Sequence, residues 1–590
     1  MESKLTEYQY AEIAEIGTFT FENYPKDIPD SLTRKVKLTQ QKITQDGNTY
    51  TTNYLAHDLY GRPTLIQETF AGKSKYTKLG YHDEKDNWIL GLPTTVKISD
   101  NNSTYITVSE IVYHDGTTAG GVYAGLGLPY EQSAYGRWIK RFTRYSSEGN
   151  LEQEEYNVAR TVGAGNRFTQ YSNYKRGIAQ TVTVPAPSGS GTMSKSRVVD
   201  NNGWITRETD FNGVSTHYQY DSLGRIKSVD YAKDPTGNID WQDELYSWSE
   251  DSDGRQTRTL KRCVLDITGS SCQSGAAFTQ TESYDGLLRL AKRSQNDGST
   301  TRHQYFKYDK DHRQTFASHW SSSNAGESKG TARTFDGLGR LQTLATSGLG
   351  TIAYEYQAGN KIKVTDGEGN VTVTSYLAYG APSYEQAIRI FAPENVTTAI
   401  NRDILGLITS INQFGYQKDG VTLATQTETR LYDSYKQLCL VKRDDVGNTA
   451  YQKNALGETN WMAQGVSNTA CTTSKPATAA VSYTLDNLGN VKAINYPDSA
   501  SADVSYERDN NGNVLKLTAG TVSHSYGYNN QNLLTSESLS IGSEKNLALA
   551  YGYTAMMHRN DITYPDGTRV YSKPNAFGWP SEIKAYNGNT

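Results

Sequence analysis

Aromatic and polar residues alternate along much of this chain, and short turns interrupt the alternation at nearly regular intervals. Clear examples of the alternation are Tyr218-Gln219-Tyr220 and Tyr526-Gly527-Tyr528. A side-chain period of two predicts β-strands, because successive side chains of a strand point to opposite faces. Apolar stripes with helical spacing over ten or more residues are scarce. The chain is therefore predicted to be mostly β-structure.

The turns between these strands share one motif, Tyr-Asp-x-x-Gly-Arg-Leu. Its clearest copies are Tyr220–Ile226 and Phe335–Leu341, and the copy Tyr284–Leu290 carries leucine in place of glycine. Aspartate at the first position of a type I turn accepts a hydrogen bond from the backbone two residues on, and glycine then takes the left-handed conformation that closes a bulged hairpin. We assign these structural repeat turns to Asp58, Gly61, Arg62, Asp210, Gly213, Tyr220, Asp221, Gly224, Arg225, Tyr284, Asp285, Arg289, Asp336, Gly339, Arg340, Asp486, Gly489, Asp509 and Gly512.

The spacing of the turns predicts how the strands are connected. Asp200, Asp210 and Asp221 head turns that are ten and eleven residues apart. About ten residues hold one strand of ordinary length and one turn. Successive copies therefore predict an all-β fold, a long antiparallel ribbon of hairpins. We expect residues 1–183 to form a β-rich part with degenerate repeats, 184–197 a Pro/Gly/Ser-rich loop or linker, and 198–590 the dense repeats of the same array.

Composition agrees with an array and excludes some functions. The chain has 590 residues, beyond a single ordinary core, with 43 Tyr against 13 Phe and 36% hydrophobic residues. Tyrosine suits sheets whose faces are partly wet. A formal charge of −4 argues against a nucleic-acid partner. The sequence shows no apolar leader and no apolar run long enough to span a bilayer, so we expect no signal peptide and no membrane-spanning segment.

Candidate chemistry is sparse, and we expect no enzyme activity, no catalytic residues, no cofactor and no metal site. The densest histidine group, His312 and His319, lies near Asp309 and is better explained as a charged hairpin end. The stretch Asp509–Asn513 resembles part of a calcium loop, but glycine occupies position 520, where a bidentate glutamate is needed. The arginine that follows each turn glycine is expected to contact a tyrosine face or a carboxylate of the neighbouring strand rather than a polyanion.

The four cysteines do not make a disulfide-dense scaffold. Cys263 and Cys272 bracket a Gly-Ser-Ser turn and could face each other across a hairpin. We expect free thiols, without excluding that pairing.

The motif copies quoted above resemble the RHS or YD-repeat family, whose bacterial members include polymorphic toxins and the cocoon-forming components of insecticidal Tc toxins. Two further phrases, Trp88–Thr94 and Asn173–Gln180, are similar to bacterial RHS proteins. The resemblance implies a β-ribbon that spirals into a hollow shell around a toxic C-terminal domain. It implies that the chain is a partial shell whose partners are a toxin domain or the remaining shell segments, and that it is secreted or at the bacterial cell surface by a non-classical route.

The family's cleavage signature, Asp-Pro-x-Gly-Leu, is matched only in part. Asp234-Pro235-Thr236-Gly237 supplies the first four letters, but Asn238 follows where leucine is expected. We interpret this stretch as an ordinary turn.

Two other functions are alternatives to a shell. Tyrosine-rich β-faces stack on sugar rings, which makes a cell-surface carbohydrate-binding module possible. A β-propeller glycosidase is less favoured, because propeller blades need about 40 to 50 residues and the turns here recur about every ten.

Overall fold

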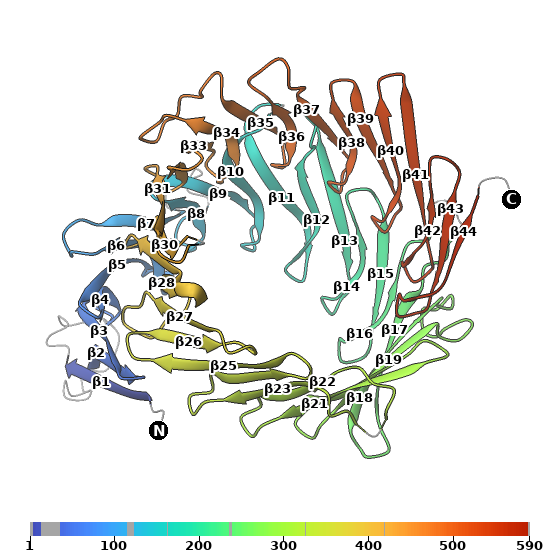
Figure 1. Cartoon of the computed structure of the whole chain (residues 1–590), viewed down its shortest axis with the longest axis horizontal. Helices are drawn as coiled ribbons and strands as arrows, with labels where there is room; N and C mark the ends of the chain where they lie inside the picture. Colours follow the sequence, from blue (N-terminus) through green and yellow to red (C-terminus); the bar gives the residue numbers. More distant parts are fainter. Residues whose placement is uncertain are drawn as a thin grey trace. The chain divides into compact units, whose positions relative to one another are not determined.

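A computed structural model describes residues 4–12, 36–114, 123–161, 163–234, 239–324, 326–417 and 419–587. These residues form 44 β-strands and no α-helix, and a short 3-10 turn, η3 (Pro393–Asn395), lies between two strands. The strands pair antiparallel with their neighbours along the chain, as Figure 1 shows for the labelled strands. The prediction of an all-β antiparallel hairpin ribbon is confirmed.

The chain divides into two compact units. Unit 1 comprises residues 1–142, 333–457 and 462–475, and unit 2 comprises 143–332, 458–461 and 476–590. The predicted seam at 184–197 stays a prediction. In the structure, Val184 and Pro185 pair with Met193 and Thr192 as the end of one hairpin.

Unit 1 holds eighteen of the strands. They are β1 (Lys4–Glu12), β2 (Val36–Gln45), β3 (Asn48–His57), β4 (Pro63–Phe70), β5 (Lys73–Glu84), β6 (Ile89–Ser99), β7 (Ile106–Tyr113), β8 (Pro129–Ala134), β24 (Leu341–Thr346), β25 (Gly350–Gln357), β26 (Lys361–Thr365), β27 (Val371–Tyr376), β28 (Ala387–Phe391), β29 (Thr397–Arg402), β30 (Ile408–Tyr416), β31 (Leu423–Tyr432), β32 (Leu438–Arg443) and β33 (Asn448–Lys453). Three strands have residues in both units: β9 (Arg137–Tyr145), β23 (Gly330–Phe335) and β34 (Thr459–Val466).

Unit 2 holds the remaining strands. They are β10 (Leu151–Ala159), β11 (Asn166–Lys175), β12 (Ile178–Pro185), β13 (Thr192–Val199), β14 (Ile205–Thr209), β15 (Ser215–Tyr220), β16 (Ile226–Asp230), β17 (Asp243–Glu250), β18 (Gln256–Cys263), β19 (Phe278–Tyr284), β20 (Leu290–Asn296), β21 (Thr301–Tyr308), β22 (Gln314–Ser318), β35 (Ala480–Leu485), β36 (Val491–Asn495), β37 (Val504–Arg508), β38 (Val514–Ala519), β39 (Val522–Tyr528), β40 (Leu534–Ile541), β41 (Lys545–Tyr553), β42 (Arg559–Thr563), β43 (Arg569–Pro574) and β44 (Pro580–Tyr586).

The pairing register shifts by one residue beside the repeat turns. The shift lies between Ser283 and Tyr284 in the β19–β20 pair, and between Leu431 and Tyr432 in the β31–β32 pair. Such a bulge arises where a turn residue adopts the left-handed conformation, because one strand then carries one residue more than its partner. The motif therefore sets the register of each hairpin as well as its end.

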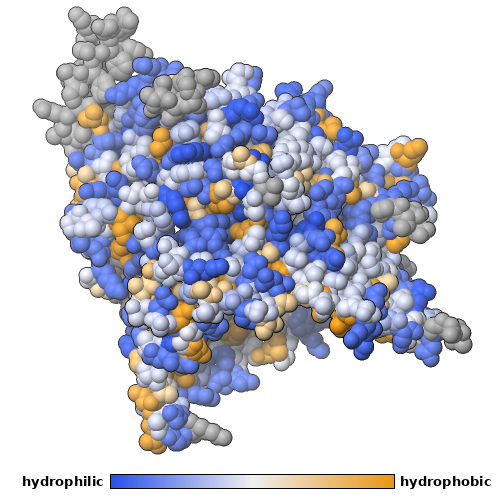
Figure 2. All heavy atoms as spheres, turned by 90° about the horizontal axis from the view of Figure 1, so that it is seen from above, coloured by the Kyte–Doolittle hydropathy of each residue, from blue (hydrophilic) through white to orange (hydrophobic). Residues whose placement is uncertain are grey.

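Little of the chain is buried in a hydrophobic core. In unit 1, Ile43, Tyr50 and Ala378 form a small buried cluster against Phe70, whose ring stacks on that of Tyr50 at 4.5 Å. Figure 2 shows apolar residues scattered in small patches among polar ones over the visible face. Most strand faces are only partly covered, and this is the physical reason why the sequence is so polar.

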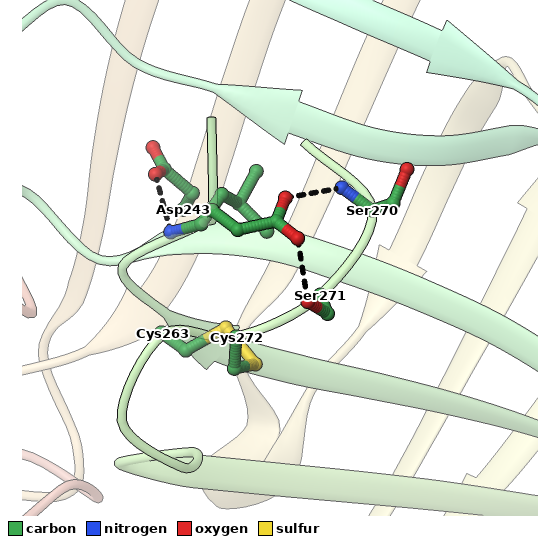
Figure 3. The surroundings of a disulfide bond; sticks show 7 residues. Asp243, Cys263, Ser270, Ser271 and Cys272 are labelled. Carbon is green, nitrogen blue, oxygen red and sulfur yellow. Dashed lines mark hydrogen bonds between the residues drawn. A yellow bond between two sulfur atoms is a disulfide. The ribbon is translucent and has the colours of Figure 1, made fainter. Parts of the chain in front are cut away.

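The expectation of free thiols is wrong. Cys263 and Cys272 form a disulfide with Cα atoms 5.6 Å apart, and Cys439 is bonded to Cys471, 32 residues further on. Cys263 ends β18, and the loop that follows folds back so that Leu265 forms a β-bridge with Cys272 (Figure 3). The fold-back depends on a loop conformation that strand and turn patterns do not encode.

Residues Pro235–Asn238, which match part of the family's cleavage signature, lie outside the described residues.

Candidate functional site: the repeat turns

The aspartate of each motif closes its turn with two backbone hydrogen bonds. Oδ1 of Asp221 accepts from the backbone N–H groups of Leu223 at 2.9 Å and Arg225 at 3.0 Å. The same pair of bonds, to the second and fourth residues onward, is made by Asp58, Asp210, Asp285, Asp336 and Asp486. Asp509 accepts from the fourth residue, Asn513. These carboxylates are occupied by their own turns, which is a structural role.

The fourth position of the turn has a positive φ angle whether or not it is glycine. The predicted turn glycines have φ between 79° and 97°: Gly61, Gly213, Gly224, Gly339, Gly489 and Gly512. Where glycine is missing, Leu288 adopts the same conformation with φ of 60°. His312 does so too, with φ of 64°, so this histidine belongs to a turn. Because a Cβ atom is disfavoured there, these copies carry local backbone strain.

The motif arginine ties its own turn to the next hairpin. Its Nε donates to Oδ2 of the turn aspartate, at 2.6 Å for Arg225 and Asp221 and at 2.8 Å for Arg289 and Asp285. Its guanidinium also lies over an aromatic ring further along the ribbon. The centroid distances are 4.7 Å for Arg62 on Tyr81, 4.5 Å for Arg225 on Trp248, 4.8 Å for Arg289 on Tyr308 and 3.8 Å for Arg340 on Tyr356. The arginines therefore contact both a carboxylate and an aromatic face.

The motif tyrosine has a role that sequence reasoning missed. The hydroxyl of Tyr220 donates at 2.7 Å to the carbonyl of Ile205, which lies five residues after Asp200, the head of an earlier turn. The hydroxyl of Tyr308 donates in the same way to Leu290, five residues after Asp285, at 3.0 Å. The pattern recurs from Tyr81 to Pro63, from Tyr432 to Ile408 and from Tyr553 to Leu534.

In each of these bonds the accepting carbonyl lies five residues after the residue that heads an earlier turn. This constant spacing is the sequence signal from which the tyrosine hydroxyl bond could have been predicted. Tyr284 is an exception, since its hydroxyl donates to Glu282 on its own strand.

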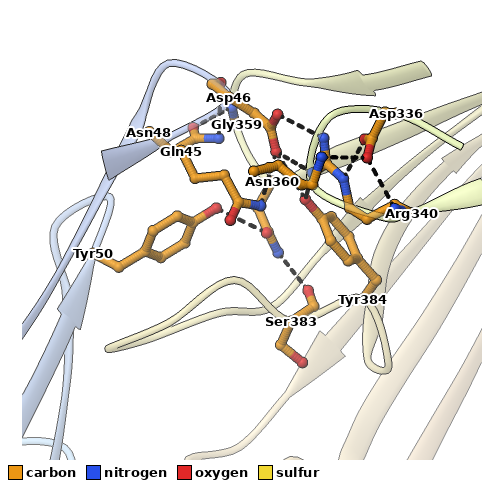
Figure 4. Close-up of polar contacts among 11 residues, drawn as sticks. Gln45, Asp46, Asn48, Tyr50, Asp336, Arg340, Gly359, Asn360, Ser383 and Tyr384 are labelled. Atoms are coloured by element: carbon orange, nitrogen blue, oxygen red, sulfur yellow. Dashed lines mark hydrogen bonds and ion pairs between the residues drawn. The ribbon is translucent and has the colours of Figure 1, made fainter. Parts of the chain in front are cut away.

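In unit 1, one repeat turn is joined to a hairpin almost three hundred residues earlier. Arg340, whose Nε binds Asp336 at 2.6 Å, also donates from Nη2 to Oδ1 of Asp46 at 2.9 Å (Figure 4). The side chains of Asp336, Asp46 and Arg340 are 1%, 5% and 15% exposed, so the two carboxylates share one buried guanidinium. The Tyr384 hydroxyl donates to Asp46 at 3.3 Å, which completes the network.

Asn360 makes a second link of the same kind beside this network. Its side chain is fully buried, its Oδ1 accepts from the Tyr50 hydroxyl at 2.9 Å, and its Nδ2 donates to the carbonyl of Ser383 at 2.7 Å (Figure 4). The Asn48 side chain accepts from the backbone N–H of Gly359 at 2.6 Å. The β2–β3 turn is thus held by residues of two later segments.

The charges in this network are stabilised by their partners. Burial by itself raises the pKa of Asp46, but hydrogen bonds from Arg340 and Gln45 outweigh it and hold that pKa below its ordinary value. Burial raises the pKa of Tyr384 to about 12, with the charge of Asp46 as a further cause. Asp46 is therefore a carboxylate and Tyr384 a neutral hydroxyl at neutral pH.

Unit 2 contains the same kind of long-range link between repeat turns. Nδ2 of Asn511, in the Asp509 turn, donates to Asp210 at 2.7 Å, and Nδ2 of Asn212 donates to Asp509 at 3.0 Å. The predicted turns at Asp210 and Asp509 therefore lie against each other. Asn487, which follows Asp486, is buried and donates to the carbonyl of Ala186 at 2.9 Å.

Two further links in unit 2 involve side chains from strands and loops. Arg167 binds Glu458 at 2.6 Å, and the indole N–H of Trp241 donates to Asn530 at 3.1 Å.

The sequence separation of these long-range bonds is nearly constant. It ranges from 289 residues for Trp241 and Asn530 to 338 for Tyr384 and Asp46. Within each unit, the ribbon therefore returns to its own earlier course after about three hundred residues. Among the described residues, the side-chain hydrogen bonds of the turns at Asp58, Asp221 and Asp285 stay within the turn or reach a nearby hairpin.

The described residues contain neither a cluster of metal ligands nor a long apolar helix. No three of their His, Cys, Asp or Glu side chains are grouped so as to hold a metal ion. Among the same residues, no helix has the length and apolar character needed to cross a membrane.

Comparison with known proteins agrees with the geometry of the turns. The RHS Repeat family matches residues 199–238, which include the turns at Asp200, Asp210 and Asp221. Residues 199–238 therefore carry an RHS repeat. No curated protein sequence matches the chain.

Two solved structures share the fold of this RHS-repeat chain. Over 99% of the chain, the crystal structure of TcdB2-TccC3 without its hypervariable C-terminal region has a TM-score of 0.54 at 9% identity. The crystal structure of TcdB2-TccC3-Cdc42 has a TM-score of 0.50 at 10% identity over the same share. The RHS-repeat chain spans 42% of the length of each of these structures. At such identities the likeness concerns the fold.

Proposed function

We propose that this RHS-repeat chain is a structural wall segment of a hollow shell, which encloses a toxin domain carried by the rest of the assembly. The observation that carries the proposal is the nearly constant return distance, from 289 to 338 residues, of the long-range hydrogen bonds. A ribbon that meets its own course at a fixed interval forms successive passes, and stacked passes make a wall. The sheet faces between passes need little hydrophobic burial, in keeping with the 36% hydrophobic content.

The chemistry of the turns favours a structural role over an enzymatic one. The turn aspartates are bound to backbone N–H groups and arginines, which leaves them no catalytic role in the turn. From β10 to β22 each strand pairs with the next without a break into four-stranded blades, which argues against the propeller alternative.

Two disulfides support a location outside the reducing cytosol. Structural disulfides persist in secreted and cell-surface proteins and are rare in the cytosol. Cys263–Cys272 and Cys439–Cys471 lie one in each unit, so both units are cross-linked. We propose that the chain acts outside the producing cell, with a toxin domain or other shell segments as its partners.

The test combines electron microscopy of the purified chain with protease protection of a reporter domain fused to its C-terminus. We expect a curved wall around a low-density interior, and cleavage of the reporter at least tenfold slower than cleavage of the same reporter fused to the N-terminus. A solid particle would contradict the wall. Equal cleavage rates at the two ends would contradict enclosure.

A further inference from the structure

A cavity of about 1050 Å³ in unit 1 differs in charge from the rest of the chain. Its lining includes four cationic side chains, Lys73, Arg389, Arg402 and Lys436, against two anionic ones, Asp100 and Asp403. Four positive charges less two negative charges leave a net charge of +2, whereas the whole chain carries −4. We name this cavity, defined by these six charged residues, the basic groove.

The cations of the basic groove are not neutralised by the protein. Among the described residues, Lys73, Arg389 and Lys436 make no ion pair, and the Arg389 guanidinium lies 5.1 Å from the centroid of the Phe391 ring. Elsewhere in the chain, arginines of the repeat turns are bound to aspartates. Unpaired cations around one cavity create a positive potential that favours an anionic ligand.

Arg402 is fixed in place without losing its charge. It stands in the tyrosine position of a motif copy, and it donates from Nε to the carbonyl of Ala387 at 3.1 Å and from Nη1 to Gly406 at 2.8 Å. The adjacent Asp403 accepts from the backbone N–H groups of Leu405 and Leu407 and so is occupied by its own turn. Carbonyl partners orient a guanidinium and leave its positive charge uncompensated.

Lys436 is also placed by the backbone. It occupies the glycine position of the Asp433 turn with φ of 61°, and its backbone N–H donates to the carbonyl of Asp433 at 3.0 Å. A left-handed residue within a hydrogen-bonded turn has little freedom, so its side chain starts from a fixed point. The groove thus combines two locally held cations with the more exposed Arg389 and Lys73.

The neutral part of the lining resembles a carbohydrate site. Tyr379 contributes a half-buried aromatic ring, whose pKa is raised by burial, and Ser74, Ser375 and Asn401 contribute neutral hydrogen-bonding groups. Aromatic rings stack on sugar rings, and hydroxyl and amide groups bind sugar hydroxyls. The volume of about 1050 Å³ is at the upper end of ligand pockets and admits several linked rings.

We propose that the basic groove binds an acidic oligosaccharide, a chain of sugars that carry carboxylates. The cations bind the carboxylates, and Tyr379 stacks on a ring. This function is independent of toxin enclosure, because it needs only the residues of unit 1.

The test is calorimetric titration of the whole chain with a hexamer of galacturonate, which carries one carboxylate per ring. We expect saturable binding that weakens as salt is added, because exposed charge pairs are screened. The double variant Arg389→Gln with Lys436→Gln should bind at least tenfold more weakly. Its matched control, Arg207→Gln with Arg255→Gln, removes the same charge from exposed arginines of unit 2 that form no ion pair with described residues, and should bind as the parent does.

Two more ligands complete the experiment. A neutral hexamer of glucose should bind at least tenfold more weakly than the galacturonate hexamer, and so should hexaglutamate, an acidic peptide. No saturable binding of galacturonate, or equal weakening by the two double variants, would overturn the site. If hexaglutamate bound as tightly as the galacturonate hexamer, the assignment to a carbohydrate would be wrong and the groove would be assigned to an acidic peptide. Circular dichroism of each variant confirms that the fold is retained.

Discussion

Replacement of Arg340 by alanine tests whether long-range links between repeat turns hold unit 1 together. The change leaves Asp46 and Asp336, which are 5% and 1% exposed, without their shared guanidinium (Figure 4). Removal of one partner from a buried ion pair destabilises a protein by about 3–5 kcal/mol, because the remaining charge is buried without compensation. We expect a loss of about 4 kcal/mol from the unfolding free energy of unit 1.

The matched control is Arg225→Ala, at the same motif position in unit 2. Arg225 binds Asp221 and lies over Trp248, but its side chain is 40% exposed and it binds no carboxylate from a distant hairpin. An exposed pair of this kind contributes about 0–1 kcal/mol. The comparison of the two variants therefore separates the stability that comes from the bond between Arg340 and Asp46 from the stability that comes from the bonds within a repeat turn.

The pH dependence of the unfolding free energy is a second test of the bond between Arg340 and Asp46. The pKa of Asp46 is lowered in the folded chain, so its contribution is present above the unfolded value of about 4 and is lost as the pH falls through the lowered value. Without Arg340, burial raises the pKa of Asp46, so the variant relieves its buried charge by taking up a proton as the pH falls. The difference in stability between the parent and Arg340→Ala should therefore be largest near neutral pH and shrink in acid.

The assay is native-state hydrogen exchange followed by mass spectrometry, because a repeat array need not unfold in one step. Peptides that cover residues 43–50 and 336–341 should lose protection in Arg340→Ala, and peptides of unit 2 should not. Equal losses of protection in Arg340→Ala and Arg225→Ala would refute the reasoning, since the link to Asp46 would then contribute nothing beyond the turn itself.

Four further substitutions test the repeat turn and one buried carboxylate. Leu288→Gly should raise the free energy of unfolding in urea by about 1 kcal/mol, because glycine adopts a φ of 60° without strain. Gly224→Ala should lower that free energy for the same reason. A lower stability of Leu288→Gly would show that Leu288 is not strained. Tyr308→Phe removes the 3.0 Å bond to the Leu290 carbonyl and should cost about 1 kcal/mol in the same measurement, and no change would remove the role of the hydroxyl.

Asp243, beside the Cys263–Cys272 disulfide, has a pKa that burial raises to about 6, although two backbone N–H groups bind it. Because the pKa of Asp243 is raised in the folded chain, its contribution to the unfolding free energy is fully present below about pH 4. That contribution, about 3 kcal/mol, is lost as the pH rises through 6. Asp243→Asn should abolish that part of the pH dependence, and an unchanged profile of urea midpoints would refute it.

Local sequence determined the repeating unit of this protein. The order Asp-x-x-Gly fixes a turn through the carboxylate and the left-handed residue, and both operate within five residues of one another, as in Asp221–Arg225. Alternation of side chains fixed the strands, and the spacing of about ten residues fixed the hairpins. The contact of the motif arginine with an aromatic ring was also expected, since cross-strand neighbours follow from hairpin pairing. Its bond to the aspartate of its own turn was not expected.

Tertiary structure alone decided which turns meet. The bond from Arg340 to Asp46 spans 294 residues, and the contact of Asn212 with Asp509 spans 297. Whether two turns so far apart in the sequence meet in space depends on small twists and bulges summed over many strands. No local sequence pattern encodes that sum. The Cys439–Cys471 disulfide and the basic groove arise in the same way, from chain segments that only the folded ribbon brings together.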